Sequence, residues 1–265
     1  MSEKKLSKTC ALVLGGHVNG YSIVKELYEQ GIKEIALFDP GLSLARCSNK
    51  VKYRAKIDEK PKTLLKELKK LNHYYDCIIL FPTDDPQLVN LNVIYDEVVD
   101  FCYMPFNRDT LLDSINKYFQ YQACEKFSIP YPKTINVKSA MDLEFIDRLT
   151  FPILIKPSTG KNLNVEVFRT LYSETKSNYL SEKKMLIEKI DKGVKFIISE
   201  YIVGDDSNIY AYTCFRSQKG EILNEWVGKK LTQHPDNFGT FSSSSNDSNE
   251  DVYKQGRLLV EALNA

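Results

Sequence analysis

The stretch 151–162, FPILIKPSTGKN, places a single lysine in an otherwise apolar strand. Lys156 follows Ile153, Leu154 and Ile155, so packing gives no reason for a charge at this position. A lysine in such a strand either extends to the surface or meets an anion in a cleft. The next residues, Ser158 to Asn162, form a small polar turn with one more cation, Lys161. Such a turn can fold over phosphates through its backbone N–H groups, which favours the cleft.

A second strand downstream runs into a turn suited to a nucleoside. Residues 195–202, KFIISEYI, carry Glu200 and are followed by Val203, a glycine and an acidic doublet. Main-chain groups of such a hinge can bind an adenine edge, and a carboxylate just beyond can bind ribose hydroxyls. The alternative for Glu200 is a simple ion pair with a lysine across the sheet. Residues 207–215 and 221–231 then predict a hairpin whose second strand carries Lys229 and Lys230.

The residues upstream of the lysine strand predict a helix and an extended connector. Residues 114–127, SINKYFQYQACEKF, are helical in pattern, with Ser114 as the expected cap. Lys117 lies near the start of this helix and can be either a ligand-binding or a solvated cation. A proline-containing connector, a strand at 133–137 and a helix at 140–149 complete the middle third.

The first third alternates apolar strands with amphipathic helices. Strands are expected at 10–14, 34–38 and 77–81, with a fourth at 98–103, and helices at 21–30 and 62–71. Strands that are apolar along their whole length require cover on both faces. The pattern therefore predicts an α/β fold with a parallel sheet, which changes to α+β in the second half.

A glycine-rich turn, GGHVNG at 15–20, invites a dinucleotide-binding interpretation, with Asp39 nineteen positions beyond. In that motif the middle glycine is bare so that a pyrophosphate can approach the backbone. Here His17 occupies this slot and would obstruct the phosphate. We therefore favour a tight strand-to-helix turn that binds no dinucleotide, and Asp84 and Asp85 are expected either at a ligand or capping the next helix.

Composition excludes several classes of protein. The 265 residues hold 36 Lys+Arg against 35 Asp+Glu, a net charge of +1, so no global basic field favours nucleic acid. No apolar run is long enough to span a membrane, and we expect a cytoplasmic protein. The six cysteines and three histidines are scattered singly, without the spacing of metal ligands. No metal-binding residue is therefore predicted.

Taken in order, these segments resemble the ATP-grasp ligases, above all carboxylate–amine ligases of the carbamoyl-phosphate-synthase-like and D-aspartate-ligase-like kinds. The matching stretches are ALVLGGHVNG, EIALFD and IILFPTDD, then SINKYFQYQ, PILIKPS, SEYIVGDD and GKKLTQHPDNFGTFSSSS. The resemblance implies a Rossmann-like pre-ATP-grasp domain, 1–113, followed by an incomplete ATP-grasp fold. Its first subdomain would be 114–202, which bears the lysines, and its second 203–265.

The resemblance also implies a site and a reaction. ATP phosphorylates a substrate carboxylate to an acylphosphate, and an amine, or a thiol, then displaces phosphate. Lys230 or its neighbour Lys229 would act near the γ-phosphate as the catalytic lysine. The expected ATP-binding residues are Lys117, Lys156, Ser158, Glu200, Tyr201, Ile202, Val203 and Asp206.

The carboxyl end departs from the family pattern. Members continue past the helix expected at 250–262 into two strands that carry a glutamate and a Glu-x-Asn element, which bind Mg²⁺. This sequence ends at Ala265, so we expect the metal ligands beyond it, a truncated or split enzyme with poor activity alone, and an apolar helix face in need of a surface. The partners expected are small carboxylate and amine substrates, with a homo-oligomer or a complementing C-terminal fragment left open. Two alternatives remain: a non-catalytic nucleotide- or partner-binding protein of the same fold, and a dinucleotide-dependent oxidoreductase.

Overall fold

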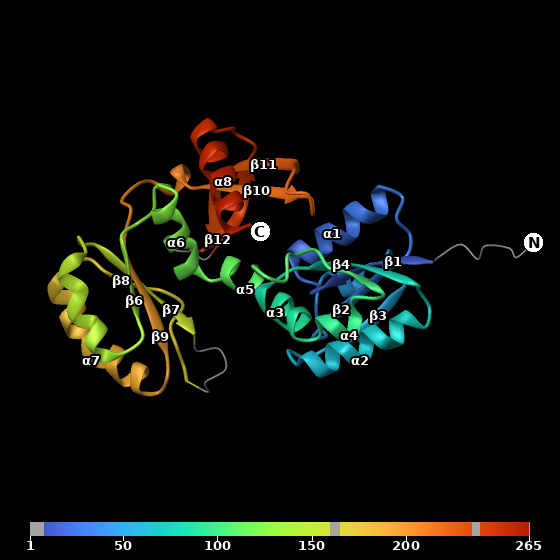
Figure 1. Ribbon diagram of the computed structural model, residues 1–265, viewed down its shortest axis with the longest axis horizontal. Coiled ribbons are helices and arrows are strands. Elements are labelled where there is room, and N and C mark those ends of the chain that lie inside the picture. The colour runs from blue at the N-terminus through green and yellow to red at the C-terminus, as the bar shows by residue number, and fades with distance from the viewer. Residues whose placement is uncertain (1–7, 160–164, 235–238, 265) are drawn as a thin grey trace, which may run out of the picture. The chain divides into compact units, whose positions relative to one another are not determined.

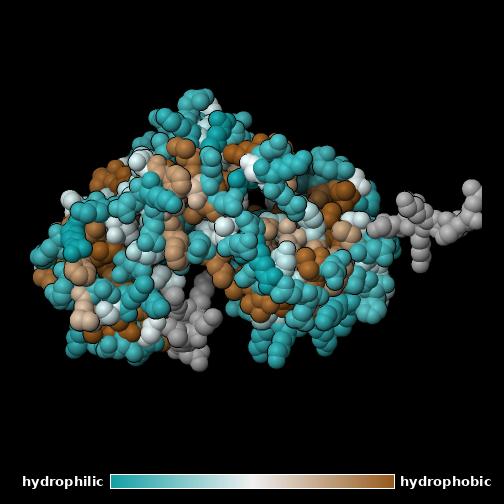
Figure 2. Space-filling view, in the orientation of Figure 1, coloured by the Kyte–Doolittle hydropathy of each residue, from teal (hydrophilic) through white to brown (hydrophobic). Residues whose placement is uncertain are grey.

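The computed structural model describes residues 8–159, 165–234 and 239–264, which divide into two compact units, 1–112 and 113–265. Figure 1 shows the elements along the chain, and each unit is described by itself. One face of the molecule is mainly hydrophilic, with scattered hydrophobic patches (Figure 2), as the balanced composition predicts.

The first unit is built on a parallel sheet of five strands in the order β3-β2-β1-β4-β5. Its strands are β1 (Thr9–Leu14), β2 (Ile35–Asp39), β3 (Tyr53–Lys56), β4 (Cys77–Pro82) and β5 (Cys102–Tyr103). Its helices are α1 (Val18–Glu29), the 3₁₀ segment η1 (Ala45–Cys47), α2 (Pro61–Asn72), α3 (Asp85–Val93) and α4 (Tyr95–Val98), and α5 (Leu111–Ser114) follows at the junction of the units. The predicted parallel sheet is confirmed.

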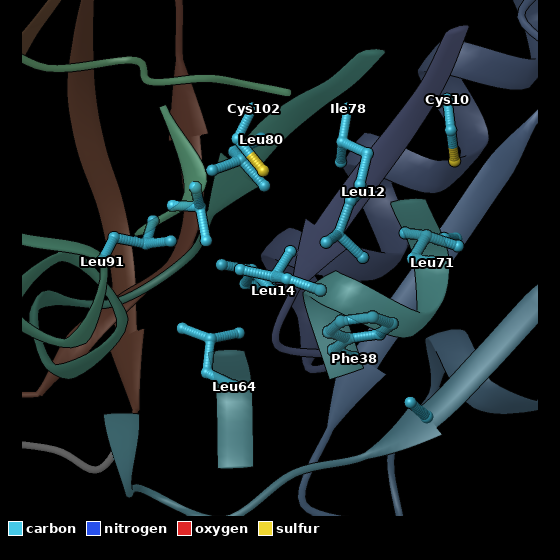
Figure 3. Packing of buried hydrophobic residues seen from close by; sticks show 14 of the residues in the cluster. Cys10, Leu12, Leu14, Phe38, Leu64, Leu71, Ile78, Leu80, Leu91 and Cys102 are labelled. Atoms are coloured by element: carbon cyan, nitrogen blue, oxygen red, sulfur yellow. The ribbon is translucent and has the colours of Figure 1, made fainter. Parts of the chain in front are cut away.

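Helices cover both faces of this sheet. Consecutive side chains of a strand point to opposite faces, so each strand contributes to two clusters. Leu12 and Leu14 pack with Phe38 and with Leu64 of α2 (Figure 3). Val13 lies on the other face and packs with Val24 of α1. Both faces are thus buried, which is why these strands are apolar along their length.

The second unit contains two antiparallel sheets. The first has four strands in the order β6-β9-β7-β8, and the second has three in the order β10-β11-β12. The strands are β6 (Thr134–Val137), β7 (Ile153–Thr159), β8 (Leu171–Ser173), β9 (Lys195–Glu200), β10 (Tyr210–Arg216), β11 (Ile222–His234) and β12 (Thr240–Ser245). The helices are α6 (Lys117–Lys126), η2 (Ala140–Arg148), α7 (Lys176–Asp191), η3 (Asp206–Asn208) and α8 (Glu250–Leu263).

One face of the four-stranded sheet is covered by α7 and η2. Ile153 and Ile155 of β7 pack there with Phe196 and Ile198 of β9 and with Leu186 of α7. These five side chains have exposed fractions of zero. The opposite face of the same sheet lies outside this core cluster.

Helix α8 packs on β10 and α6, but none of its described residues is buried and Leu258 keeps an exposed fraction of 37%, so the expectation that its apolar face needs a surface stays a prediction. Tyr253 of α8 meets Tyr212 of β10 edge to face, with ring centroids 6.2 Å apart. Glu225 of β11 accepts a hydrogen bond of 2.9 Å from the Tyr212 hydroxyl and pairs with Arg257 of α8. A Cβ on Gly256 would lie 2.4 Å from the Tyr212 ring, so this glycine permits the close contact.

Several expected boundaries were wrong. The helix predicted at 114–127 begins only at Lys117, because α5 ends at Ser114. Its cap is Asn116, whose side chain accepts from the Tyr118 N–H, rather than Ser114. The strand predicted at 98–103 is helical up to Val98 and extended only at Cys102–Tyr103. The turn predicted from Ser158 is still strand through Thr159, and Lys161 lies outside the described residues.

Candidate functional site

The candidate site is the face of the four-stranded sheet opposite its core. Ile155 of β7 is in the core, so strand alternation places Lys156 on the opposite face. The antiparallel register pairs Lys156 with Ile197 of β9, which has an exposed fraction of 6% but is outside the core cluster. Lys156 is half-buried, with its aliphatic stem beside an apolar neighbour rather than fully in solvent.

Two other cations, Lys117 and Arg169, affect the charge of Lys156. The pKa of Lys156 is lowered, first by burial and then by the positive charges of Lys117 and Arg169. Lys117 is the first residue of α6, and Arg169 lies just before β8. No hydrogen bond or ion pair joins any of the three to another residue of the described part. A group of like charges without an anionic partner is suited to bind a polyanion.

Sequence analysis selected Lys117 and Lys156 and missed Arg169. Arg169 lies in no strand, so no sequence pattern indicates that it is near Lys156. It comes near Lys156 only because β8, which follows it, pairs with β7, and this pairing is a long-range contact. Ser158 lies in β7, two residues beyond Lys156, and its side chain is exposed.

The hinge after β9 presents an apolar surface beside the same face. Tyr201 continues the alternation of Ser199 and its ring meets Tyr172 of β8 edge to face, with centroids 5.4 Å apart. Ile202 and Val203 follow with exposed fractions of 72% and 74%. An aromatic edge and two exposed aliphatic side chains form a surface suited to a purine ring.

Glu200 is placed differently from the lysines. It pairs with Ile153, which is in the core, so its side chain leaves the sheet on the side opposite Lys156. Its carboxylate accepts a hydrogen bond of 2.8 Å from the backbone N–H of Thr150. The Glu200 N–H donates to the Lys133 carbonyl at 2.9 Å. The hydrogen-bond partner of this carboxylate in the described part is therefore a backbone amide rather than a lysine, and the structure does not bring it to Lys156.

The acidic doublet beyond the hinge, Asp205 and Asp206, leads into η3. Asp205 accepts from the Ser207 N–H at 2.8 Å, and hydrogen bonds from Ser207, aided by Lys229, lower its pKa. Asp206 is the first residue of η3, and its side chain lies outside the described part. A Cβ on Gly204 would meet no atom within 4 Å, so crowding does not require glycine there.

The paired lysines of β11 point to opposite faces of the second sheet. Lys229 pairs with Tyr210 and its ammonium lies 5.9 Å from that ring, on the face that α8 covers. Lys230 lies on the other face, with an exposed fraction of 3%, and donates to the Gln233 side chain. Of the two, Lys230 therefore lies on the face that α8 does not cover, although its side chain is buried there.

The glycine turn of the first unit is explained by packing. A Cβ on Gly15, which has a φ of +98°, would lie 2.1 Å from the Thr83 hydroxyl oxygen, and one on Gly20 would lie 2.0 Å from the Gly15 carbonyl oxygen. Thr83 also donates to the Leu14 carbonyl at 2.7 Å, and Asn19 donates to the Thr83 carbonyl at 3.0 Å. These contacts link α1 and β1 to the end of β4, where a parallel sheet of this order ordinarily binds a dinucleotide.

Asp39 is equally committed inside the fold. It is fully buried, pairs with Arg46 at 2.6 Å and accepts from the Ser43 hydroxyl. It is therefore not available to ribose hydroxyls, which agrees with the preference against a dinucleotide. Asp84 caps α3 by accepting from the Gln87 N–H at 2.9 Å, one of its two expected roles.

Residues 8–159, 165–234 and 239–264 contain no group of three or more His, Cys, Asp or Glu side chains that could hold a metal ion. Among the same residues, no helix is long and apolar enough to cross a membrane.

A Rossmann-like parallel unit, a lysine-bearing antiparallel sheet and a second small sheet are the parts of the ATP-grasp fold, and the chain has this fold. Among curated proteins it is similar to D-aspartate ligase of Enterococcus faecium (strain Aus0004), with 25% identity over 63% of this chain and 42% of that protein. No family model matches the chain.

Two solved structures illustrate the likeness in fold. One is an ADP complex of N5-carboxyaminoimidazole ribonucleotide synthetase, with a TM-score of 0.71 and 17% identity over 97% of this chain and 64% of that one. The other is an L-amino acid ligase from Bacillus licheniformis, with a TM-score of 0.65 and 15% identity over 97% and 60%. The chain thus spans less than two thirds of the length of each of these three proteins.

Proposed function

We propose that the protein is an ATP-dependent carboxylate–amine ligase that acts through an acylphosphate. The observation that carries this proposal is the half-buried Lys156, which lies on the face of the four-stranded sheet opposite its core, is influenced by the charge of Lys117, and has no anionic partner in the described part. The similarity to D-aspartate ligase supports an amino acid among its substrates.

ATP would supply the phosphoryl group that activates a substrate carboxylate. In this proposal Lys117 and Lys156 bind the phosphates and offset their charge, since phosphoryl transfer depends mainly on positioning and electrostatics. Tyr201, Ile202 and Val203 hold the adenine, and Asp206 binds the ribose. Lys230 lies on the face of its sheet that α8 does not cover, and it is favoured over Lys229 as the lysine near the γ-phosphate. The Glu200 carboxylate orders the start of β7 through Thr150.

The described residues do not provide a Mg²⁺ site, so no step is assigned to a metal. Mg²⁺ and small carboxylate and amine substrates remain predictions from the resemblance. A cytoplasmic location remains a prediction from the sequence composition. A homo-oligomer or a complementing fragment is also still a prediction.

An acylphosphate trap tests the proposal directly. The 265-residue chain is incubated with ATP, Mg²⁺ and hydroxylamine, and carboxylic acids are screened, D-aspartate and L-amino acids first. Because we expect poor activity of this chain alone, we expect slow ADP release with hydroxamate formation for one acid, and loss of both in Lys156→Met but not in Lys184→Met, an exposed lysine of α7.

Calorimetry with ATP, ADP and NAD separates the alternatives. Nucleotide binding without ADP release for any acid would favour a non-catalytic binding protein. Tighter binding of NAD than of ATP would refute the assignment.

A further inference from the structure

We propose that the solvent face of α2, together with a hollow at its C-terminal end, is a docking surface for an acidic partner protein. The partner offers a short acidic segment that carries one aromatic side chain. This surface belongs to the first unit and uses none of the residues assigned to the nucleotide. The inference therefore goes beyond the proposed function and does not depend on it.

Positive charge is concentrated in one segment of the chain. Residues 50–70 hold nine Lys and Arg against three Asp and Glu, a net charge of +6. Because the whole chain has a net charge of +1, the remaining residues together carry −5. A local excess of one sign steers an oppositely charged partner to one place on the surface.

Helix α2 carries its cations on the side opposite its core. Three leucines on one side, Leu64, Leu68 and Leu71, are fully buried in the core of the first unit. The other side carries exposed cations and a histidine at helical spacing, here called the basic stripe: Lys62, Lys66, Lys69, Lys70 and His73. At 3.6 residues per turn these five positions fall within an arc of about 100°, roughly opposite the leucines, and the stripe is about 16 Å long. Glu67, the one acidic residue of α2, falls outside this arc.

Little in the described part neutralises the basic stripe. Its first two lysines form no hydrogen bond or ion pair with another described residue. Lys69 pairs with Glu97 at 3.5 Å and Lys70 pairs with Glu67 at 2.6 Å, and about half of each lysine side chain is exposed. Ion pairs as exposed as these are weak, so they open at little cost when the carboxylates of a partner approach.

A hollow of about 360 Å³ lies at the C-terminal end of the basic stripe, lined by Tyr53, Lys70, His73 and Tyr74. Three rings in series connect it to the core. The buried Phe38 contacts Tyr53, and Tyr53 contacts Tyr74, with ring centroids 6.1 Å apart in each pair. These contacts hold the Tyr74 ring in place although 62% of the residue is exposed. An exposed ring that is already ordered is suited to pack on an aromatic side chain of a partner.

The extent of the basic stripe favours a protein over a nucleic acid. A nucleic acid is a long polyanion, and beyond the stripe it would meet a remainder of the chain whose net charge is −5. A short acidic segment matches the stripe within its length, and one aromatic side chain fills the one hollow. Such a partner is steered by charge and held by a buried aromatic contact.

Two labelled peptides test the proposal on the full chain. One is a short helical peptide rich in Glu and Asp with a central Phe, and the other has Ala in place of this Phe. We expect both to bind and the Phe peptide to bind more tightly. Raising the salt from about 0.05 M to about 0.5 M should weaken both, because screening shortens the reach of exposed charges.

A pair of double variants tests the basic stripe. Lys62→Gln with Lys66→Gln removes two unpaired charges of the stripe, and we expect the affinity for both peptides to fall about fivefold. The matched control Lys184→Gln with Lys192→Gln removes two exposed charges at the same spacing or wider on and just after α7, and should change affinity less than about twofold. Affinity for ATP should stay within about twofold of the wild type in both.

A pair of tyrosine variants tests the hollow. Tyr74→Ala should lower the affinity for the Phe peptide to that for the Ala peptide and leave the Ala peptide unaffected. The control Tyr21→Ala, at an exposed tyrosine of α1, should change neither. Equal losses for the two peptides in Tyr74→Ala would refute the role of the hollow.

Equal peptide affinities in the two double variants would overturn the proposal. So would a wild-type chain that binds neither peptide at low salt. A labelled oligothymidylate that binds more tightly than the Phe peptide, with the same dependence on Lys62 and Lys66, would assign the basic stripe to nucleic acid and would also overturn it. None of these results bears on ATP binding, so the proposed function stands or fails separately.

Discussion

Replacing Lys156 with methionine should weaken nucleotide binding and leave the fold at least as stable. Methionine retains most of the apolar stem that lies beside Ile197, so packing survives. It removes a charge that burial and two neighbouring cations disfavour. Because the ammonium is only half-buried, solvent screens much of this cost, and we expect a gain below about 1 kcal/mol. Loss of a charge-assisted phosphate contact, about 1.5–3 kcal/mol, lowers affinity roughly 10- to 150-fold.

The pH dependence of stability gives this prediction a second signature. The folded state holds the pKa of Lys156 below its ordinary value of 10.5, so between the two values the unfolded chain binds more protons. Wild-type stability therefore rises with pH across that window relative to Lys156→Met, and the advantage of the variant shrinks as pH approaches 10.5.

Calorimetric titration with ATP and thermal unfolding between pH 7 and 10 measure both effects, with Lys184→Met as the control. A melting temperature several degrees below that of the wild type would make the role of Lys156 structural. Unchanged ATP affinity would make it an ordinary surface lysine. Either result refutes the reasoning.

Three further outcomes are expected. Gly20→Ala should destabilise the first unit by about 1–3 kcal/mol in thermal unfolding, because the added Cβ would lie 2.0 Å from a backbone oxygen. The control Gly204→Ala, with open space around it, should change stability by less than about 0.5 kcal/mol. Equal effects would contradict the packing argument. Arg46→Met leaves the buried Asp39 carboxylate without its ion-pair partner and should lower the free energy of unfolding in urea by about 3–5 kcal/mol. A decrease below about 1 kcal/mol would argue against a buried charge at Asp39. Arg257 and a tyrosine hydroxyl lower the pKa of Glu225, so its contribution to stability is present above its ordinary value of 4.5 and is lost as pH falls through the lowered pKa. The protection factors of the α8 amides, which are corrected for the intrinsic pH dependence of hydrogen exchange, should fall over that acidic range in the wild type but not in Glu225→Gln, and identical profiles would contradict this.

The parallel sheet was predictable because its strands are buried on both faces and therefore read as continuous apolar runs. The shorter edge strands β3 and β8 were not predicted, since three or four residues carry too little pattern. Helix α7 was also missed. Its fully buried positions are only Tyr179, Leu186 and Ile190 among sixteen mostly polar residues, so its pattern is weak.

The candidate site was predictable where one residue conflicts with its surroundings. Lys156 conflicts with an apolar strand, and that conflict indicated the face of the sheet for which we propose phosphate binding. The Glu200 carboxylate could not be placed, because its partner at Thr150 is fifty residues away in sequence. The choice between Lys229 and Lys230 needed the position of α8, which decides which face of the hairpin is covered.

The charge around Lys156 on the four-stranded sheet also affects how the protein should be handled. Sulfate and inorganic phosphate are small polyvalent anions, and if Lys156 and Lys117 bind phosphates as proposed, these anions should compete for the same side chains at buffer concentrations. An affinity for ATP measured in phosphate buffer would therefore be an underestimate, and a melting temperature measured in sulfate would be raised by the bound anion. Screens for the natural substrate should accordingly be run in a zwitterionic buffer with chloride as the counter-ion.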